Sequence, residues 1–512
     1  MIRIVLVGLV LGTMAQHSAV AVESQPNVIF ILADDLGWAD TTLYGHTKLY
    51  QTPNIQRLAK RGMTFSRAYA NSPLCSPTRA SILTGQLPLR HGSTRPEHHL
   101  KTVRMAPSYK ENTPPGEKAI SVTTASRLDT KLPTLAKLLK GAGYTTGHFG
   151  KWHLGHKPYS PLEHGFDIDI PNHPGPGPAG SYVAPWRFKN FKPNSPKEHI
   201  EDRMAKEAIA WMKSVKDKGP FFMNYWQFSV HGPWNAKQEL VTKYKKVIKP
   251  GDRQRSAIYA AMIESMDDAI GSLIDAVDEA GIADETVIIF VSDNGGNMYS
   301  KLDGIFPTDN FPLRGGKASM CEGGIRVPCV VVWPGVTKAK TRSDQLVQTS
   351  DFYPTILNQL GIKIPTDHKV DGVDISPALA GEKLSRKGII NYFPDPAMVP
   401  DWVPPAISLH SGDWKLLRLF HQGEKGAHDY LLYNLAEDIG EKNNLADKYP
   451  ERVKEMDRIL EEAIKETGGL VPIPNPNFDP AQYRPEQIGK PTKEFIKKHW
   501  KNSKSGGATR NK

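Results

Sequence analysis

The chain has 512 residues, of which 23% are charged and 39% are hydrophobic, a balance that excludes an intrinsically disordered protein. The formal net charge is +11, but residues 481–512 alone carry nine basic and two acidic side chains. The positive charge is therefore mostly a property of this tail, which we expect to be solvated and partly disordered. Weak attraction of the tail to polyanions or membrane surfaces is the alternative. No segment has the pattern of a module that binds nucleic acid, so no nucleic-acid partner is expected.

The N-terminus has the pattern of a secretory signal peptide over residues 1–21. Arg3 precedes an apolar stretch from Ile4 to Ala15, and Ala19-Val20-Ala21 supplies the small-x-small cleavage pattern. No other run approaches the ~20 apolar residues that a membrane-spanning helix needs. We therefore expect an exported protein, periplasmic or extracellular, with no transmembrane segment after signal cleavage. An uncleaved anchor is the less favoured alternative at this length.

Short apolar runs rich in branched and aromatic residues predict buried strands. They cover residues 27–33, 144–149, 220–226, 286–292 and 329–333. Helical patterns lie between these runs, over residues 132–142, 198–215 and 257–280. This alternation predicts an α/β catalytic domain over residues 22–380, with a large, mostly parallel mixed sheet sandwiched by helices. Pro and Gly crowd residues 170–196 and indicate a long surface loop that lines a substrate cleft.

The pattern changes after residue 380. Short strands are predicted near residues 389–392, 414–419 and 430–433, followed by a helix from about residue 450 to residue 466. We therefore expect a smaller C-terminal α+β subdomain with antiparallel strands over residues 381–475. The basic tail then covers residues 476–512.

Three cysteines are too few for a disulfide scaffold. Cys321 and Cys329 could pair, although their spacing does not decide it, and Cys75 is then left over. If a helix begins at Ser76, Cys75 lies at its positive end and Arg79 follows one turn later. A nucleophile beside a guanidinium suits an anionic tetrahedral substrate. The alternative is an incidental cysteine at the start of a helix.

Residues 75–85 contain Cys-x-Pro-x-Arg followed by Ala-x-x-x-Thr-Gly. This motif resembles the signature of the type I, arylsulfatase-like sulfatases of the alkaline-phosphatase superfamily, and it matches at every fixed position. The other landmarks of that family occur in the same order over roughly residues 26–450. The resemblance implies that a formylglycine-generating or maturase enzyme oxidises Cys75 to formylglycine, whose hydrate is the nucleophile.

Oxygen-bearing side chains follow two of the predicted strands. Asp34 and Asp35 end the strand at 27–33, and Asp293 and Asn294 end the strand at 286–292. Each pair alone could be a solvated strand end, but together the side chains can converge on a hard divalent cation. The resemblance assigns all four residues to a calcium-like metal, with an oxygen of the modified Cys75 as a further ligand. Magnesium is the alternative metal.

Four further residues gain a role only through the resemblance. It places Lys151 on the sulfate and His153 near the formylglycine hydroxyls. His231 matches the family's leaving-group histidine, and Lys317 matches its sulfate-holding lysine. The resemblance also places the Arg79 guanidinium on the sulfate, and each of these residues alone could be an ordinary loop residue.

The substrate beyond the sulfate is less well indicated. Arg90 and His91 follow the signature helix closely, so we expect them to touch the substrate, with a structural salt bridge as the alternative. Trp186, His173 and Trp402 are further candidates for a sugar-binding pocket, with core packing as an equal alternative.

The signal peptide and the long loop favour a sulfatase acting on sulfated oligo- or polysaccharides, similar to bacterial carbohydrate sulfatases. The alternatives are a phosphonate monoester or phosphodiester hydrolase of the same superfamily, and a catalytically silent protein that binds sulfated glycans. The sequence does not indicate an oligomeric state.

Overall fold

The computed structural model describes residues 25–302, 304–395, 399 and 401–501, so the predicted signal peptide lies outside the described residues. The strands of the main sheet are β1 (Asn27–Ala33), β2 (Met63–Tyr69), β6 (Thr145–Gly150), β7 (Ile168–Ile170), β8 (Phe221–Trp226), β9 (Thr286–Ser292), β11 (Arg326–Val332), β12 (Thr341–Ser343) and β13 (Val347–Gln348). Within the described residues the strand order is β12-β2-β11-β9-β1-β8-β6-β7, with β13 also paired to β2. No helix of this part of the chain is long and apolar enough to cross a membrane.

The central strands of this sheet are parallel. β1 pairs with β8 and β9, and β6 pairs with β7 and β8, all in parallel. β11 runs antiparallel to both β2 and β9. The predicted mixed, mostly parallel sheet is therefore confirmed, and each of the five predicted strands is present. β11 begins three residues earlier than predicted, because Arg326 and Val327 still pair with β2.

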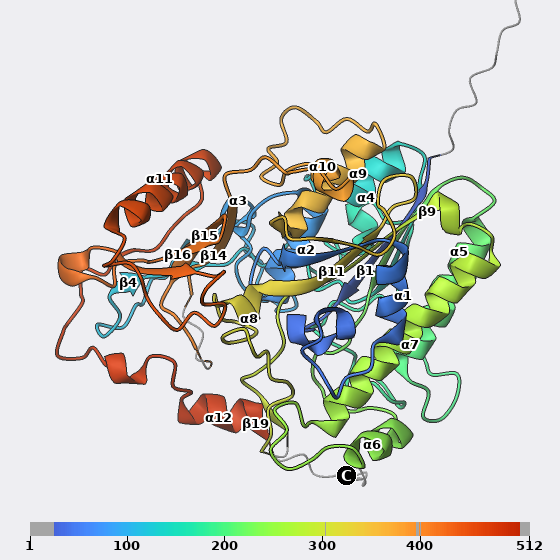
Figure 1. The fold of residues 1–512 in the computed structure, drawn as a ribbon, viewed down its shortest axis with the longest axis horizontal. Coiled ribbons are helices and arrows are strands. Elements are labelled where there is room, and N and C mark those ends of the chain that lie inside the picture. Colours follow the sequence, from blue (N-terminus) through green and yellow to red (C-terminus); the bar gives the residue numbers. More distant parts are fainter. Residues whose placement is uncertain (1–24, 303, 396–398, 400, 502–512) are drawn as a thin grey trace, which may run out of the picture.

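Helices cover both faces of the sheet (Figure 1). One face carries α1 (Pro53–Arg61), α5 (Ile200–Val215), α6 (Gln238–Lys245) and α7 (Ala257–Glu279), and the other carries α2 (Cys75–Thr84), α4 (Leu135–Gly141), α9 (Phe352–Gln359) and α10 (Ser376–Leu379). Ile29 and Ile31 of β1 enter the first core, whereas Val28 and Phe30 enter the second. Successive side chains of a strand point to opposite faces, so a strand covered on both faces is apolar throughout.

The C-terminal subdomain has a separate antiparallel sheet, as predicted. Its strands are β14 (Ile389–Phe393), β15 (Ala406–Ser411), β16 (Trp414–Leu419) and β17 (Asp429–Asn434), in that order. The turn from β15 to β16 uses Gly412 at φ 57, a left-handed conformation that glycine adopts without a steric penalty. Helix α11 (Pro450–Thr467) packs on this sheet through Val453, Met456 and Leu460. Figure 1 shows the subdomain in orange and red beside the main sheet.

The predicted basic tail contains regular structure up to residue 501, and the side chains of residues 481–500 are exposed or half-buried, so partial disorder of the tail stays a prediction. We call residues 476–501 the C-terminal strap. It contains α12 (Lys493–His499) and β19 (Trp500–Lys501), and β19 pairs with β10 (Lys301–Leu302). Two aromatic residues hold it: Phe495 packs on Tyr299 at 5.7 Å between ring centroids, and Trp500 Nε1 donates to the Tyr299 carbonyl at 2.8 Å. Residues 502–512 lie outside the described residues.

The three cysteines are buried and free. The pairing of Cys321 with Cys329, which the spacing left open, therefore does not form.

Candidate active site

Four parallel strands deliver polar side chains to one edge of the main sheet. Asp34 and Asp35 follow β1, Lys151 follows β6, His231 lies beyond β8, and Asp293 follows β9. The carboxyl ends of neighbouring parallel strands meet at the same edge, which is where ligands bind in open α/β sheets. The three carboxylates and Lys151 have no exposed side-chain surface. The predicted residues therefore meet in a water-excluded cluster.

Helix α2 brings Cys75 to this edge as its first residue, one position earlier than the predicted helix start. The Cys75 Sγ lies 3.5 Å from Nδ1 of His153. One turn later, Arg79 donates from Nε to Oδ2 of Asp293 at 2.8 Å and from Nη1 to the Lys151 carbonyl at 2.7 Å. Ser76 Oγ donates to the His153 carbonyl at 2.7 Å. The signature helix is thus bonded to the segment that follows β6.

The environment of Cys75 disfavours its thiolate. Burial raises the pKa of the thiol, although Lys151 and Lys317 oppose this effect. The thiolate is the nucleophilic form of cysteine, so an unmodified Cys75 is a poor nucleophile at neutral pH.

The acidic side chains have the geometry of a cation site. Ligand atoms of Asp34, Cys75 and Asp293 lie within 4.8 Å of one another. Asp34 Oδ1 and Asn294 Oδ1 are buried, and neither has a hydrogen-bond partner among the described residues. Burial raises the pKa of Asp34, and Asp293 and Asp35 add to the effect while Lys151 opposes it. A hard divalent cation would satisfy both oxygens and favour the ionised carboxylates, so this donor set fits Ca²⁺ or Mg²⁺.

Two buried lysines face the carboxylates. Lys151 Nζ lies 2.6 Å from Oδ2 of Asp34, and Lys317 Nζ lies 2.7 Å from Asp35. Burial alone would raise the pKa of Asp35, but Lys317, and then His231 and Lys151, hold it below its usual range. With Arg79, these cations form the wall of a site suited to an anionic group.

His231 presents Nε2 to the same cluster. Its Nδ1 lies 2.6 Å from the Gly232 carbonyl and must donate to it, which leaves Nε2 at 3.9 Å from Oδ2 of Asp35. Burial, and secondarily Lys317, lowers the pKa of His231 to about 3. Tyr182, from the predicted long loop at 170–196, donates its hydroxyl to the His231 carbonyl at 2.8 Å. That loop therefore helps to fix this histidine.

His153 is placed by a turn and by a second histidine. The stretch after β6 does not continue as extended backbone, because His153 has a left-handed φ of 56°. Its Nδ1 still faces Cys75, and its Nε2 lies 2.9 Å from Nδ1 of His99. His99 was not among the predicted site residues. It lies in an irregular segment, where neither a motif nor a strand end marks it.

Arg90 and His91 make intramolecular contacts of the kind expected for the structural alternative. Arg90 donates from Nη2 to Oδ1 of Asp371 at 2.6 Å. His91 Nε2 lies 3.1 Å from Oγ of Ser81, and its Nδ1 accepts from the Ser93 backbone N–H at 3.1 Å. Substrate binding by Arg90 and His91 stays a prediction.

The three aromatic candidates have different surroundings. Trp186 belongs to the main core and donates from Nε1 to the Phe191 carbonyl at 2.8 Å, so core packing accounts for it. His173 lies edge-on against Phe188. Trp402 lines a cavity beside the C-terminal strap.

Comparison with known proteins identifies the family. The sequence model of the sulfatases matches residues 26–362, and that of the C-terminal region of N-sulphoglucosamine sulphohydrolase matches residues 316–467. The chain belongs to the sulfatase family, as the signature at Cys75 indicated, and it is a sulfuric ester hydrolase of type I.

Its relatives include sulfatases of animals and bacteria. The chain is 33% identical to N-acetylgalactosamine-6-sulfatase of Sus scrofa over 387 residues, which are 72% of this chain and 68% of the relative. It is 30% identical to a sulfatase of Formosa agariphila over 98% of both chains. The crystal structure of Ps i-CgsB in complex with k-i-k-neocarrahexaose has 29% identity and a TM-score of 0.68, covering 86% of this chain and 93% of the other. A phosphonate monoester hydrolase of Agrobacterium radiobacter, at 20% identity and a TM-score of 0.59, shares the fold.

Proposed function

We propose that this protein is an exported carbohydrate sulfatase, which hydrolyses sulfate monoesters of sulfated oligo- or polysaccharides and releases inorganic sulfate. The observation that carries the proposal is the position of the signature residue Cys75 beside the Asp34–Asp293 cluster and the cations Arg79, Lys151 and Lys317. The names of relatives that act on N-acetylgalactosamine sulfate or bind a neocarrahexaose support a sugar substrate. The signal-peptide pattern supports export.

Two groups would complete the site. Cys75, oxidised to formylglycine and hydrated, would supply a hydroxyl as the nucleophile in place of a thiol that burial keeps protonated. Asp34, Asp35, Asp293 and Asn294 would hold Ca²⁺, or alternatively Mg²⁺, and the cation would polarise a sulfate oxygen.

The chain's own residues would bind the ester and move its protons. Arg79, Lys151 and Lys317 would neutralise the sulfate oxygens, and such fixed charges are usually the largest contribution to this kind of catalysis. His153 Nδ1 faces position 75 and would accept a proton from a hydroxyl there. His231 Nε2 would give a proton to the departing sugar oxygen. The anionic ester would raise the pKa of His231 from its low resting value, so that the histidine can carry this proton.

The first test is the mass of the tryptic peptide Ala68–Arg79 from protein made in its native host. Conversion to formylglycine removes hydrogen sulfide from the cysteine side chain and adds one oxygen, which lowers the mass. Converted protein should release sulfate from sulfated saccharides, whereas Cys75→Ala should release none. Converted protein that is inactive on sulfate esters but cleaves phenyl phosphonate esters would favour the phosphonate hydrolase. An unconverted peptide in a protein that still binds sulfated glycans would favour the silent binder.

A further inference from the structure

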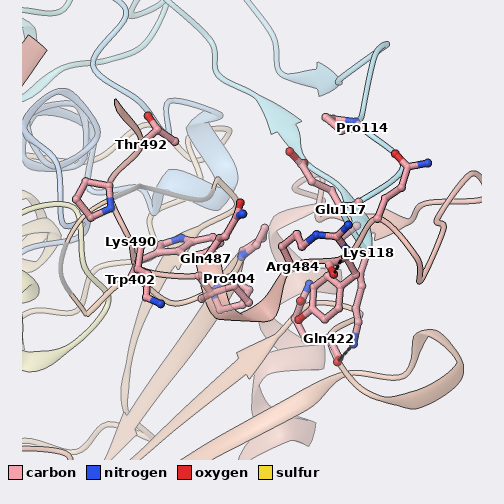
Figure 2. A pocket seen from close by; sticks show the side chains of 17 residues that line it. Pro114, Glu117, Lys118, Trp402, Pro404, Gln422, Arg484, Gln487, Lys490 and Thr492 are labelled. Atoms are coloured by element: carbon pink, nitrogen blue, oxygen red, sulfur yellow. Dashed lines mark hydrogen bonds between the residues drawn. The ribbon is translucent and has the colours of Figure 1, made fainter. Parts of the chain in front are cut away.

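A cavity of about 570 Å³ lies outside the catalytic cluster. Its walls come from parts of the chain that lie far apart in the sequence: residues 114–119, residues 402–405, Gln422 and the C-terminal strap. Figure 2 shows Trp402 and Lys490 at one end of the cavity, and Lys118 and Arg484 at the other. None of the residues assigned to the catalytic cluster lines it.

One wall of the cavity packs against the segments that carry active-site residues. Trp402 packs in the same apolar cluster as Leu74 and Ala318, which are the chain neighbours of Cys75 and Lys317. Next to Ala318, Ser319 Oγ donates to the carbonyl of Asp401 at 3.0 Å. The wall that contains Trp402 is therefore continuous with the loop that places Lys317.

The lining combines aromatic rings with cations. Lys118 Nζ donates to the Gln422 carbonyl at 2.6 Å and lies 4.8 Å from the centroid of the Tyr483 ring. Arg484 Nη1 donates only to backbone carbonyls, those of Ala481 and Tyr483. No ion pair with a carboxylate is found for Lys118, Arg484 or Lys490 within the described residues, whereas Arg79, Lys151 and Lys317 all have carboxylate partners.

The lining also contains the carboxylate of Glu117, which against Lys118, Arg484 and Lys490 leaves a formal charge of +2. Trp402 Nε1 is buried and, over the same described ranges, has no hydrogen-bond partner. An aromatic face suits the C–H face of a sugar ring, side-chain amides such as that of Gln487 suit its hydroxyls, and unpaired cations suit its sulfate groups.

Part of the cavity's lining lies beyond the regions that the two family models match. The two matching family models end at residues 362 and 467, before the strap residues that line the cavity. The strap is fixed by Phe495 and Trp500 on Tyr299, so its lining side chains are presented on an ordered segment.

We propose that this cavity is a subsite for sulfated sugar units of the same glycan whose sulfate ester is cleaved at Cys75. Lys118, Arg484 and Lys490 bind sulfate groups of these units, and Trp402 stacks on a sugar ring. This inference rests on the proposed function, since it assigns the cavity to the same substrate.

The test measures binding to the full-length Cys75→Ala protein, which has no nucleophile and leaves the glycan intact. The probes are neocarrahexaose and a chondroitin 6-sulfate hexasaccharide, each with its desulfated counterpart, measured by calorimetry. Adding Arg484→Ala and Lys490→Ala should weaken the binding of the preferred sulfated hexasaccharide at least about tenfold, on the order of two charge-assisted contacts. Both side chains are exposed, and an unchanged melting temperature checks that the variant is folded.

The matched control is Lys497→Ala with Lys498→Ala, which removes the same charge from the same strap at positions that do not line the cavity. Equal loss of affinity in both double variants would mean that only the overall charge matters, and it would overturn the proposal. Unchanged affinity of the Arg484→Ala/Lys490→Ala variant would also overturn it. So would failure of both sulfated probes to bind. Sulfate release by the Cys75 enzyme is scored separately. If the wild-type enzyme and its Arg484→Ala/Lys490→Ala variant release sulfate with the same KM, the subsite is overturned and the proposed function is not. No release, together with variant-sensitive binding, overturns the proposed function alone.

Discussion

Two buried oxygens at the edge of the main sheet define the first prediction. Asp34 Oδ1 and Asn294 Oδ1 have no hydrogen-bond partner among the described residues, and a cation would bind both. We expect chelator-treated protein to gain thermal stability when calcium is added, by about 2.7 kcal/mol at a concentration a hundred times the Kd. Asn294→Leu should weaken this response. The measurement is the melting temperature across a calcium titration.

The control for this prediction is a buried carboxylate elsewhere. Asp267 accepts from the backbone N–H groups of Asn54 and Ile55 at 2.8 and 2.9 Å. Asp267→Asn should lower stability equally with and without calcium. An identical calcium response in wild type and Asn294→Leu would remove Asn294 from the metal site.

His99 is the second residue with a testable role. When Nε2 of His153 donates to Nδ1 of His99, the Nδ1 of His153 is left as the free base toward position 75. His99→Phe should lower kcat about tenfold, the value of one hydrogen bond of somewhat over 1 kcal/mol, and leave KM for a small sulfate ester nearly unchanged. His99→Asn should restore much of the rate, because its Oδ1 can accept in place of Nδ1. A fully active His99→Phe enzyme would show that His153 needs no such partner.

At the scale of the elements, the turn after β9 and the short helix α8 (Glu322–Ile325) meet without room for a side chain. A Cβ at Gly295 would lie 1.8 Å from the carbonyl oxygen of Gly323. Gly295→Ala should therefore separate Asp293 and Asn294 from the loop that carries Lys317, lower the free energy of unfolding by about 3 kcal/mol and abolish sulfate release. Urea unfolding and an activity assay measure the two effects.

Gly141→Ala is the matched control. Gly141 ends α4, and a Cβ there would meet no atom within 4 Å. Because alanine favours a helix by up to about 1 kcal/mol over glycine, this change should be neutral or stabilising. Equal loss of stability in both variants would mean that the contact with Gly323 does not decide the outcome.

The same elements show which parts of the fold and the site could be predicted from the sequence alone. β1 could be predicted because both of its faces are buried, whereas Thr64, Ser66 and Arg67 interrupt the pattern of β2, which is not among the predicted strands. The residues after strand ends, such as Asp293, could be placed in the site because parallel strands end together. His99 could not, because its partner His153 is 54 positions away and only the tertiary fold joins them.

The C-terminal strap was missed for a similar reason. Its charge indicated a solvated tail, and its side chains are indeed exposed or half-buried, but the charge gave no sign that Phe495 and Trp500 contact Tyr299, about 200 residues earlier in the chain. Composition reports the charge of a segment and not the surface on which its few aromatic residues pack. Arg90 likewise pairs with Asp371, 281 positions away, so proximity to the signature helix in sequence did not identify its partner.

At the scale of the whole molecule, a buried charge network joins the two sheets. Glu322, in α8 (Glu322–Ile325), accepts from Tyr69 of β2 at 2.8 Å and from His410 of β15 at 2.7 Å. Lys415 of β16 bridges Glu322 and Glu441 at 3.2 and 2.7 Å. Removing one member of such a network leaves an uncompensated buried charge and costs about 3–5 kcal/mol. Because Glu322 follows Lys317 by five residues, the C-terminal subdomain also supports the catalytic loop.

This network makes the stability of the whole molecule sensitive to pH. Burial lowers the pKa of His410 to about 4, although Glu322 opposes the effect, whereas an unfolded histidine titrates near ~6.5. Between these values the unfolded chain holds more protons than the folded one, so stability falls as the pH falls, by about 2 kcal/mol at pH 5. His410→Gln, whose amide can still donate to Glu322, should lose this part of the pH dependence, and the exposed control His156→Gln should retain it. Urea unfolding at pH 7 and pH 5 measures the difference, and parallel behaviour of His410→Gln and wild type would show that His410 does not control it.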